Sequence, residues 1–224
     1  MISYGHTFNF LNVIRFNLFY TFATIPSGGV PVTVSPMLLA VPATILIAEA
    51  VSYTHLDVYK RQLSALLAFP EDDALDALRD MLPVAPWLSP AIDELAQRPL
   101  EHWQGEHTRL FLSGYPKTPC PPFESAYRQG QMGGTAAGDL EVLYRRAGLG
   151  ARLAPADYLG TLLECLALLE ERGDAEGIIG ELWGAHLQRW LPRFARDLQI
   201  HGEFELYRLL GSRLAGLCGE VELA

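Results

Sequence analysis

Cysteine is scarce in this chain. Three occur among its 224 residues, at Cys120, Cys165 and Cys218, and no two of them stand in a Cys-x-x-Cys spacing. An odd count without that spacing argues against a disulfide framework and against the common zinc and thiol-redox motifs. We therefore expect reduced thiols in a cytoplasmic protein, with Cys165 and Cys218 in or near a core.

A surplus of basic residues is also missing. The chain has 17 Lys and Arg against 26 Asp and Glu, which gives a formal net charge of −9. Proteins that bind nucleic acid need a basic face to neutralise phosphates. The charge balance therefore argues against a nucleic-acid partner.

Recognisable catalytic and metal-binding motifs are lacking as well. The glycine-rich stretch Gly133–Gly138 has neither the Lys-Ser/Thr of a phosphate loop nor a preceding strand, so we interpret it as a flexible connector. His102 and His107 are five residues apart. Five helical steps leave two rings about 140° apart around the axis, whereas metal-binding pairs are four residues apart. We expect no metal, no cofactor and no enzymatic activity; an all-α hydrolase would need one of these signals to be real.

Asparagine and lysine are unevenly distributed. The three Asn lie at Asn9, Asn12 and Asn17, and from Leu63 onward there is one Lys against 13 Arg. Residues 63–224 carry 14 basic and 24 acidic side chains, a net charge of −10. The break in composition predicts that residues 1–50 are an unrelated or out-of-frame segment, disordered and not part of the native protein.

The junction at 51–62 has an unusual coding property. Asp57–Gln62 can be encoded as GAT GTG TAT AAG AGA CAG, and the reverse complement of that string, shifted in frame, encodes Val51–His55. The segment resembles two head-to-head sequencing-library adapters translated in frame. We therefore take 63–224 as the native domain, which lacks the start of its first helix.

One apolar run approaches the length of a membrane span. Val30–Ala48 is uncharged, but Pro31, Pro36 and Pro42 interrupt it. Each proline removes a helical hydrogen bond, and no secretory layout surrounds the run. We expect no stable membrane insertion.

The remaining 162 residues repeat apolar side chains at helical spacing, and alternating strand patterns are lacking. The pattern predicts one all-α, single-domain helical bundle. The expected helices are Glu71–Leu82, one starting at Ser89 as cap with Pro90 in the first turn, Leu100–Leu110, Asp139–Ala147, Asp157–Arg172, one from Asp174 as cap to Pro192, and Glu203–Cys218. Asp157–Arg172 is apolar on more than one face, which predicts a central position.

Three motifs follow one another along this bundle. Leu110-Phe111 ends a helix and leads into a proline-rich loop, Ser113–Tyr127. We expect the second half of this loop to be presented at the surface, namely Pro121, Pro122, Phe123, Glu124, Ser125 and Tyr127. Pro155–Gly160 begins the leucine-rich helix, and His186–Phe194 reads His-Leu-x-x-Trp-x-x-x-Phe. In this order the motifs resemble the TorD/DmsD (nitrate-reductase-delta-like) family of redox enzyme maturation chaperones, although Tyr158 stands where that family usually has His.

The resemblance implies a client-binding site. Its predicted residues are Leu110, Phe111, Pro122, Phe123, Glu124, Ser125, Tyr127, Asp157, Tyr158, His186 and Trp190. A leader with two arginines before an apolar stretch needs an apolar groove with carboxylates near its mouth. Glu124 and Asp157 could supply the carboxylates. Three readings stay open: core packing for Leu110 and Phe111, helix capping for Asp157, and packing for His186 and Trp190.

The function implied by the resemblance is cytoplasmic chaperoning. Such a protein binds the twin-arginine signal peptide or the apo form of a molybdenum-cofactor oxidoreductase, aids cofactor insertion and proofreads export. Its partner is then the catalytic subunit of that oxidoreductase. The alternative is a helical adaptor that assembles respiratory reductase subunits without reading a leader.

Overall fold

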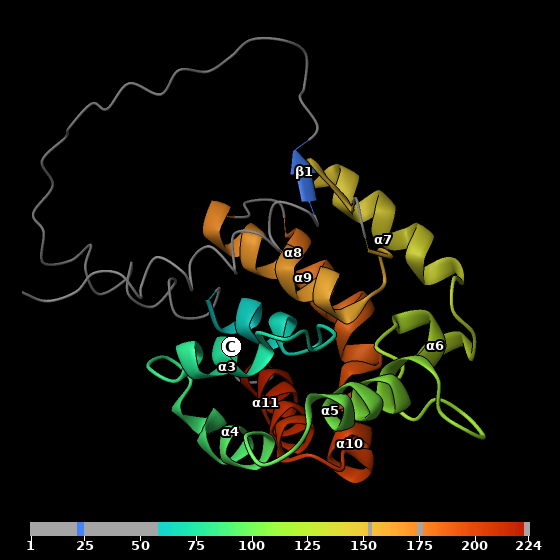
Figure 1. Ribbon diagram of the computed structural model, residues 1–224. Helices are drawn as coiled ribbons and strands as arrows, with labels where there is room; N and C mark the ends of the chain where they lie inside the picture. The colour runs from blue at the N-terminus through green and yellow to red at the C-terminus, as the bar shows by residue number, and fades with distance from the viewer. Residues whose placement is uncertain (1–21, 25–57, 152–153, 174–176, 222–224) are drawn as a thin grey trace, which may run out of the picture.

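The computed structural model describes residues 22–24, 58–151, 154–173 and 177–221, and helices form nearly all of the regular structure there (Figure 1). This confirms the predicted all-α class. The run Val30–Ala48 and the junction residues 51–57 lie outside the described residues.

The first described helix spans 58–65, so it crosses the boundary that the sequence placed at Leu63. Lys60 is buried, and its ammonium contacts the carboxylate of Glu170 at 2.7 Å. Arg61 pairs with Glu171 at 2.5 Å. Residues on the adapter-like side of the boundary therefore pack on the domain; the boundary itself stays a prediction.

The helical elements follow in chain order: α3 (Ala74–Met81), η1 (Pro86–Leu88), α4 (Ser89–Leu95), α5 (Leu100–His107), η2 (Thr108–Leu112), α6 (Glu124–Gln129), α7 (Thr135–Arg146), α8 (Leu159–Arg172), α9 (Ile178–Glu181), η3 (Leu182–His186), η4 (Leu187–Arg189), α10 (Leu191–His201) and α11 (Glu205–Val221). Helix α10 packs along α11, and α11 also contacts α4.

The structure differs from the sequence prediction at several helix ends. Pro192 does not end a helix but lies in the first turn of α10, where a missing amide costs nothing. Helix α7 begins at Thr135, so Gly138 is helical and the predicted connector is shorter. Ser89 is the first residue of α4 rather than its cap, because η1 runs directly into it. The predicted cap Asp174 lies outside the described residues.

One short strand pair accompanies the bundle. β1 (Phe22–Thr24) runs antiparallel to β2 (Leu149–Ala151), with Phe22 opposite Ala151. The sequence pattern did not predict β2, because three residues are too few for an alternation to be recognised.

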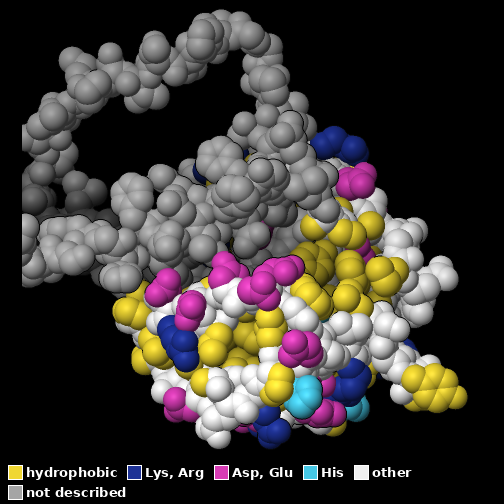
Figure 2. All heavy atoms as spheres, in the orientation of Figure 1, with side chains coloured by type: hydrophobic (Ala, Val, Ile, Leu, Met, Phe, Trp, Pro, Cys, Tyr) yellow, Lys and Arg dark blue, Asp and Glu magenta, His cyan; other side chains and the backbone are white. Residues whose placement is uncertain are grey.

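Acidic side chains are spread over the face drawn in Figure 2, in keeping with the net charge of −9. None of the described helices has the length and apolarity needed to cross a membrane.

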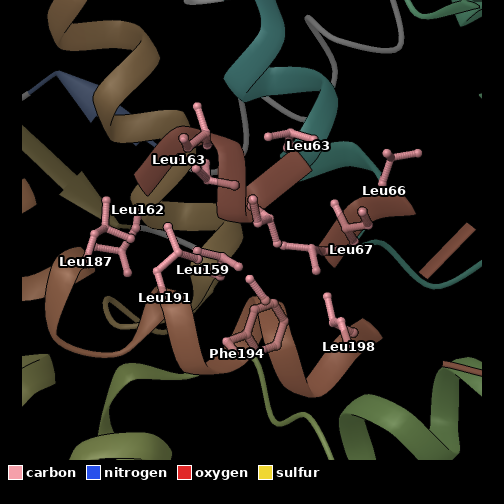
Figure 3. Packing of buried hydrophobic residues seen from close by; sticks show 14 of the residues in the cluster. Leu63, Leu66, Leu67, Leu159, Leu162, Leu163, Leu187, Leu191, Phe194 and Leu198 are labelled. Carbon is pink, nitrogen blue, oxygen red and sulfur yellow. The ribbon is translucent and has the colours of Figure 1, made fainter. Parts of the chain in front are cut away.

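Helix α8 lies at the centre of the core, as its sequence predicted. Leu159, Leu162 and Leu163 are fully buried (Figure 3). They pack in one cluster with Leu63 of the first helix and Phe194 of α10. Each fully buried leucine contributes roughly 1.5–3 kcal/mol of hydrophobic stabilisation. This core fixes the start of α8, where the candidate site lies.

Candidate functional site

The proline-rich loop and the start of α8 are joined through their backbones. Phe123 and Tyr158 form an antiparallel bridge. The amide of Glu124 donates to the carbonyl of Asp157 at 3.0 Å, and the amide of Leu159 donates to the carbonyl of Pro122 at 2.9 Å. Two of the predicted motifs, distant in the sequence, thus form one junction.

Asp157 caps a helix, but not its own. Its carboxylate accepts a hydrogen bond from the amide of Ser125 at 3.1 Å, in the first turn of α6. Helix α8 has no side-chain cap of this kind at Tyr158. Asp157 is buried, so the carboxylate joins the two motifs from inside the fold.

Glu124 links the same junction to the third motif. Its side chain is fully buried and forms an ion pair with Arg128, one turn further along α6. Nδ1 of His186, at the end of η3, lies 3.0 Å from its second oxygen. One carboxylate thereby holds α6 and η3 together.

The aromatic residues of the motifs pack on one another. The rings of Phe123 and Tyr158 lie 5.6 Å apart. The ring centroids of Tyr127 and Trp190 lie 5.5 Å apart, and Trp190 is almost fully buried. The hydroxyl of Tyr127 donates a hydrogen bond to the carboxylate of Asp197 at 3.1 Å. The guanidinium of Arg193 lies over the half-buried Tyr127 ring, with its carbon 5.5 Å from the ring centroid.

Leu110 and Phe111 belong to the core. Both are buried, within the π-helical turn η2. The ring of Phe111 meets the rings of Tyr207 at 5.3 Å and His107 at 4.9 Å in edge-to-face contacts. The core-packing reading that the sequence left open for this pair describes their position here.

The expectation that the loop presents its second half is wrong. Pro122, Phe123, Glu124 and Ser125 are buried, whereas Leu112 and Tyr115 are exposed, Tyr115 completely. The physical reason is that backbone groups at 122–124 pair with 157–159, and buried amides and carbonyls need such partners. The predicted carboxylates therefore face inward. Direct contact of these residues with a leader stays a prediction.

Two side chains converge on one carbonyl beside the junction. The hydroxyl of Tyr158 donates to the carbonyl of Leu67 at 3.2 Å, and Nε2 of His107 lies 3.1 Å from the same oxygen. Burial raises the pKa of Tyr158 above its usual value and lowers the pKa of His107. Both groups are therefore neutral near pH 7. The sequence did not predict this convergence, because Leu67 belongs to another segment.

The remaining candidate reactive side chains are His102, His107 and Cys120. His107 is buried and His102 is exposed, as their spacing around the helix predicts. Burial raises the pKa of the Cys120 thiol to about 12, which leaves it unreactive. Within the described ranges, no group of three or more His, Cys, Asp or Glu could hold a metal ion.

A comparison with solved structures found a similar fold. A crystal structure from Archaeoglobus fulgidus, described as that of a redox enzyme maturation protein, superposes with a TM-score of 0.53 at 24% identity. The match covers 74% of this chain and 92% of that one, and at this identity it shows the fold alone. A comparison with curated proteins found no significant match.

The family match covers all three motifs. Residues 66–196 match the family model described as nitrate reductase delta subunit. This range is more than half of the chain and contains the loop, the start of α8 and the His186–Phe194 segment. The chain therefore belongs to the nitrate reductase delta subunit family.

Proposed function

We propose that this protein is a maturation chaperone for a molybdenum-cofactor oxidoreductase. It binds the twin-arginine signal peptide or the apo form of that enzyme in the cytoplasm, keeps it receptive until the cofactor is inserted, and delays its export. The observation that carries the proposal is the family match over residues 66–196. The structural likeness to a redox enzyme maturation protein agrees with it.

The geometry of the motifs supports binding rather than catalysis. Asp157 accepts a hydrogen bond from the first turn of α6, and Glu124 of α6 contacts His186 of η3. The three side chains are buried, so these contacts form a buried polar network. Such a network holds a surface in one shape, which lowers the entropic cost of recognising a partner. The family motifs then act by positioning the surface around them.

A second candidate function has one specific observation in its favour. Arg128 and the amide of Ser125 already occupy the carboxylates of Glu124 and Asp157. A leader arginine could bind these carboxylates only after displacing those partners. The inward carboxylates therefore favour an assembly adaptor that recognises a subunit of a respiratory reductase without reading a leader.

Titration calorimetry separates the two. The full chain is titrated with a twin-arginine leader peptide and with its Lys-Lys counterpart. Leader binding supports the chaperone, and Phe123→Ala and Tyr127→Ala should weaken it by roughly 1–3 kcal/mol each if these side chains are anchors. Glu124→Gln and Asp157→Asn should reduce the preference for Arg-Arg if the carboxylates bind arginine directly. Binding of the apo subunit without binding of either leader would establish the adaptor instead.

A further inference from the structure

An apolar groove lies away from the motif junction. It has a volume of about 160 Å³ and runs between the first helical segment and α3. Its apolar lining residues include Ala65, Ala68, Phe69, Ala74, Ala77 and Trp103. Figure 2 shows hydrophobic surface bordered by acidic side chains on this face.

The lining of the groove suits an apolar occupant. Four of its residues are alanines, and these short side chains leave the space open. Phe69 is 42% exposed at its edge, while Trp103 and Leu206 are buried beneath it. Exposed apolar surface that forms a concave site is typical of ligand or protein recognition.

The acidic rim of the groove favours an occupant that carries positive charge. Glu71, Asp73 and Asp80 line the groove, and all three are exposed. Arg79, the basic residue of α3, does not line the groove and pairs with Asp76 at 2.8 Å. An apolar segment that carries basic residues at one end therefore complements the groove, and an acidic segment is repelled.

The groove is also connected to the family motifs. At its edge, the ring of Phe69 meets His107 at 5.3 Å, and His107 meets Phe111 at 4.9 Å. Tyr158 holds the carbonyl of Leu67, within the segment that forms the groove wall. The buried motif residues thus fix the position of this wall.

We propose that this groove binds the leader of the client, with the apolar stretch between the first helical segment and α3 and the paired arginines on the acidic rim. The inference rests on the proposed function and assigns it a binding site. The buried motif residues contact the wall of this site and hold it in position. A second copy of this chain would bring its own net charge of −9 toward the acidic rim, which disfavours it as the occupant.

A substitution that fills the groove tests whether the apolar stretch of the leader binds there. The probe is a fluorescent synthetic peptide of about twenty residues, with Arg-Arg followed by an apolar stretch, titrated into the full chain by anisotropy. Ala77→Phe places a ring in the groove, and we expect Kd to rise at least about tenfold. The matched control is Ala137→Phe on α7, an alanine of similar exposure away from the groove, which should leave Kd unchanged.

Neutralising the rim tests the charged part. Glu71→Gln combined with Asp80→Asn should weaken binding of the Arg-Arg peptide and flatten its salt dependence. Asp139→Asn combined with Glu141→Gln removes the same charge from exposed positions on α7 and should change neither. A peptide with Glu-Glu in place of Arg-Arg should bind more weakly to the unmodified chain.

The outcomes separate the groove from the function. If the unmodified chain binds the Arg-Arg peptide and Ala77→Phe binds it equally well while folded by circular dichroism, the groove inference is overturned and the proposed function stands. If the unmodified chain binds no leader peptide, leader reading and the groove inference both fall. A dimer that Ala77→Phe converts to a monomer would assign the groove to a second copy. Equal affinity for the Glu-Glu peptide would overturn the charge argument.

Discussion

The carboxylate of Asp157 accepts a hydrogen bond from the backbone amide of Ser125 at 3.1 Å. This bond connects the residue before α8 to the first turn of α6, and both residues are buried. An aspartate that a local reading assigns to its own helix therefore stabilises a helix that begins 33 positions earlier.

Removing this cap should lower stability. Asp157→Ala leaves an amide in the first turn of α6 without its partner, and we expect a loss of about 0.5–2 kcal/mol in the free energy of unfolding. Asp157→Asn retains a side-chain oxygen and should lose less. Urea denaturation measures both, with the exposed Asp139→Ala as control. Equal stabilities of the two alanine variants would contradict the cap.

A close approach at Gly160 gives a second prediction. A Cβ there would lie 2.5 Å from a ring carbon of Tyr158 and 3.2 Å from the hydroxyl of Ser64. Gly160→Ala must therefore displace the Tyr158 ring, and we expect a loss of about 1–3 kcal/mol. Gly105→Ala in α5 meets no atom within 4 Å and should instead stabilise by about 0.5–1 kcal/mol. Thermal unfolding of both variants checks the opposite signs.

The buried carboxylate of Glu124 gives a third prediction. Glu124→Ala leaves the buried His186 and the exposed Arg128 without their shared buried carboxylate, and we expect a loss of roughly 1.5–3 kcal/mol in chemical denaturation. The matched control is Glu181→Ala, whose ion pair with Arg146 is exposed at both ends and should cost no more than about 1 kcal/mol. A smaller loss at Glu124 than at Glu181 would show that the buried network does not stabilise the fold.

His107 predicts a pH dependence. Burial lowers its pKa below the ordinary value of about 6.5, so between the two values the unfolded chain binds more protons than the folded one. The contribution of His107 to stability is therefore complete above about pH 6.5 and falls as the pH decreases toward its lowered pKa. His107→Gln should reduce the slope of stability against pH, and exposed His102→Gln should not. Denaturation midpoints from pH 5 to 8 test this; identical slopes for both variants would contradict it.

Periodicity in the sequence determined the helical class, because an apolar repeat of three and four residues is a local property of each segment. The central position of α8 followed from leucines on more than one of its faces, and Leu159 and Leu162 are fully buried. The order of the three motifs was equally visible, and the family match over residues 66–196 contains all of them.

Tertiary structure alone decided which way the motif residues face. Whether Glu124 points outward depends on Arg128 and His186, and the second of these is 62 residues away. The acidic run that begins at Glu71 reads in the sequence only as a favourable helix start. It becomes the rim of a groove because the fold brings Leu66, Phe69 and Ala77 into the lining of the same groove. Hydrogen-bond partners and concave surfaces arise from contacts between segments, and no pattern within one segment specifies them.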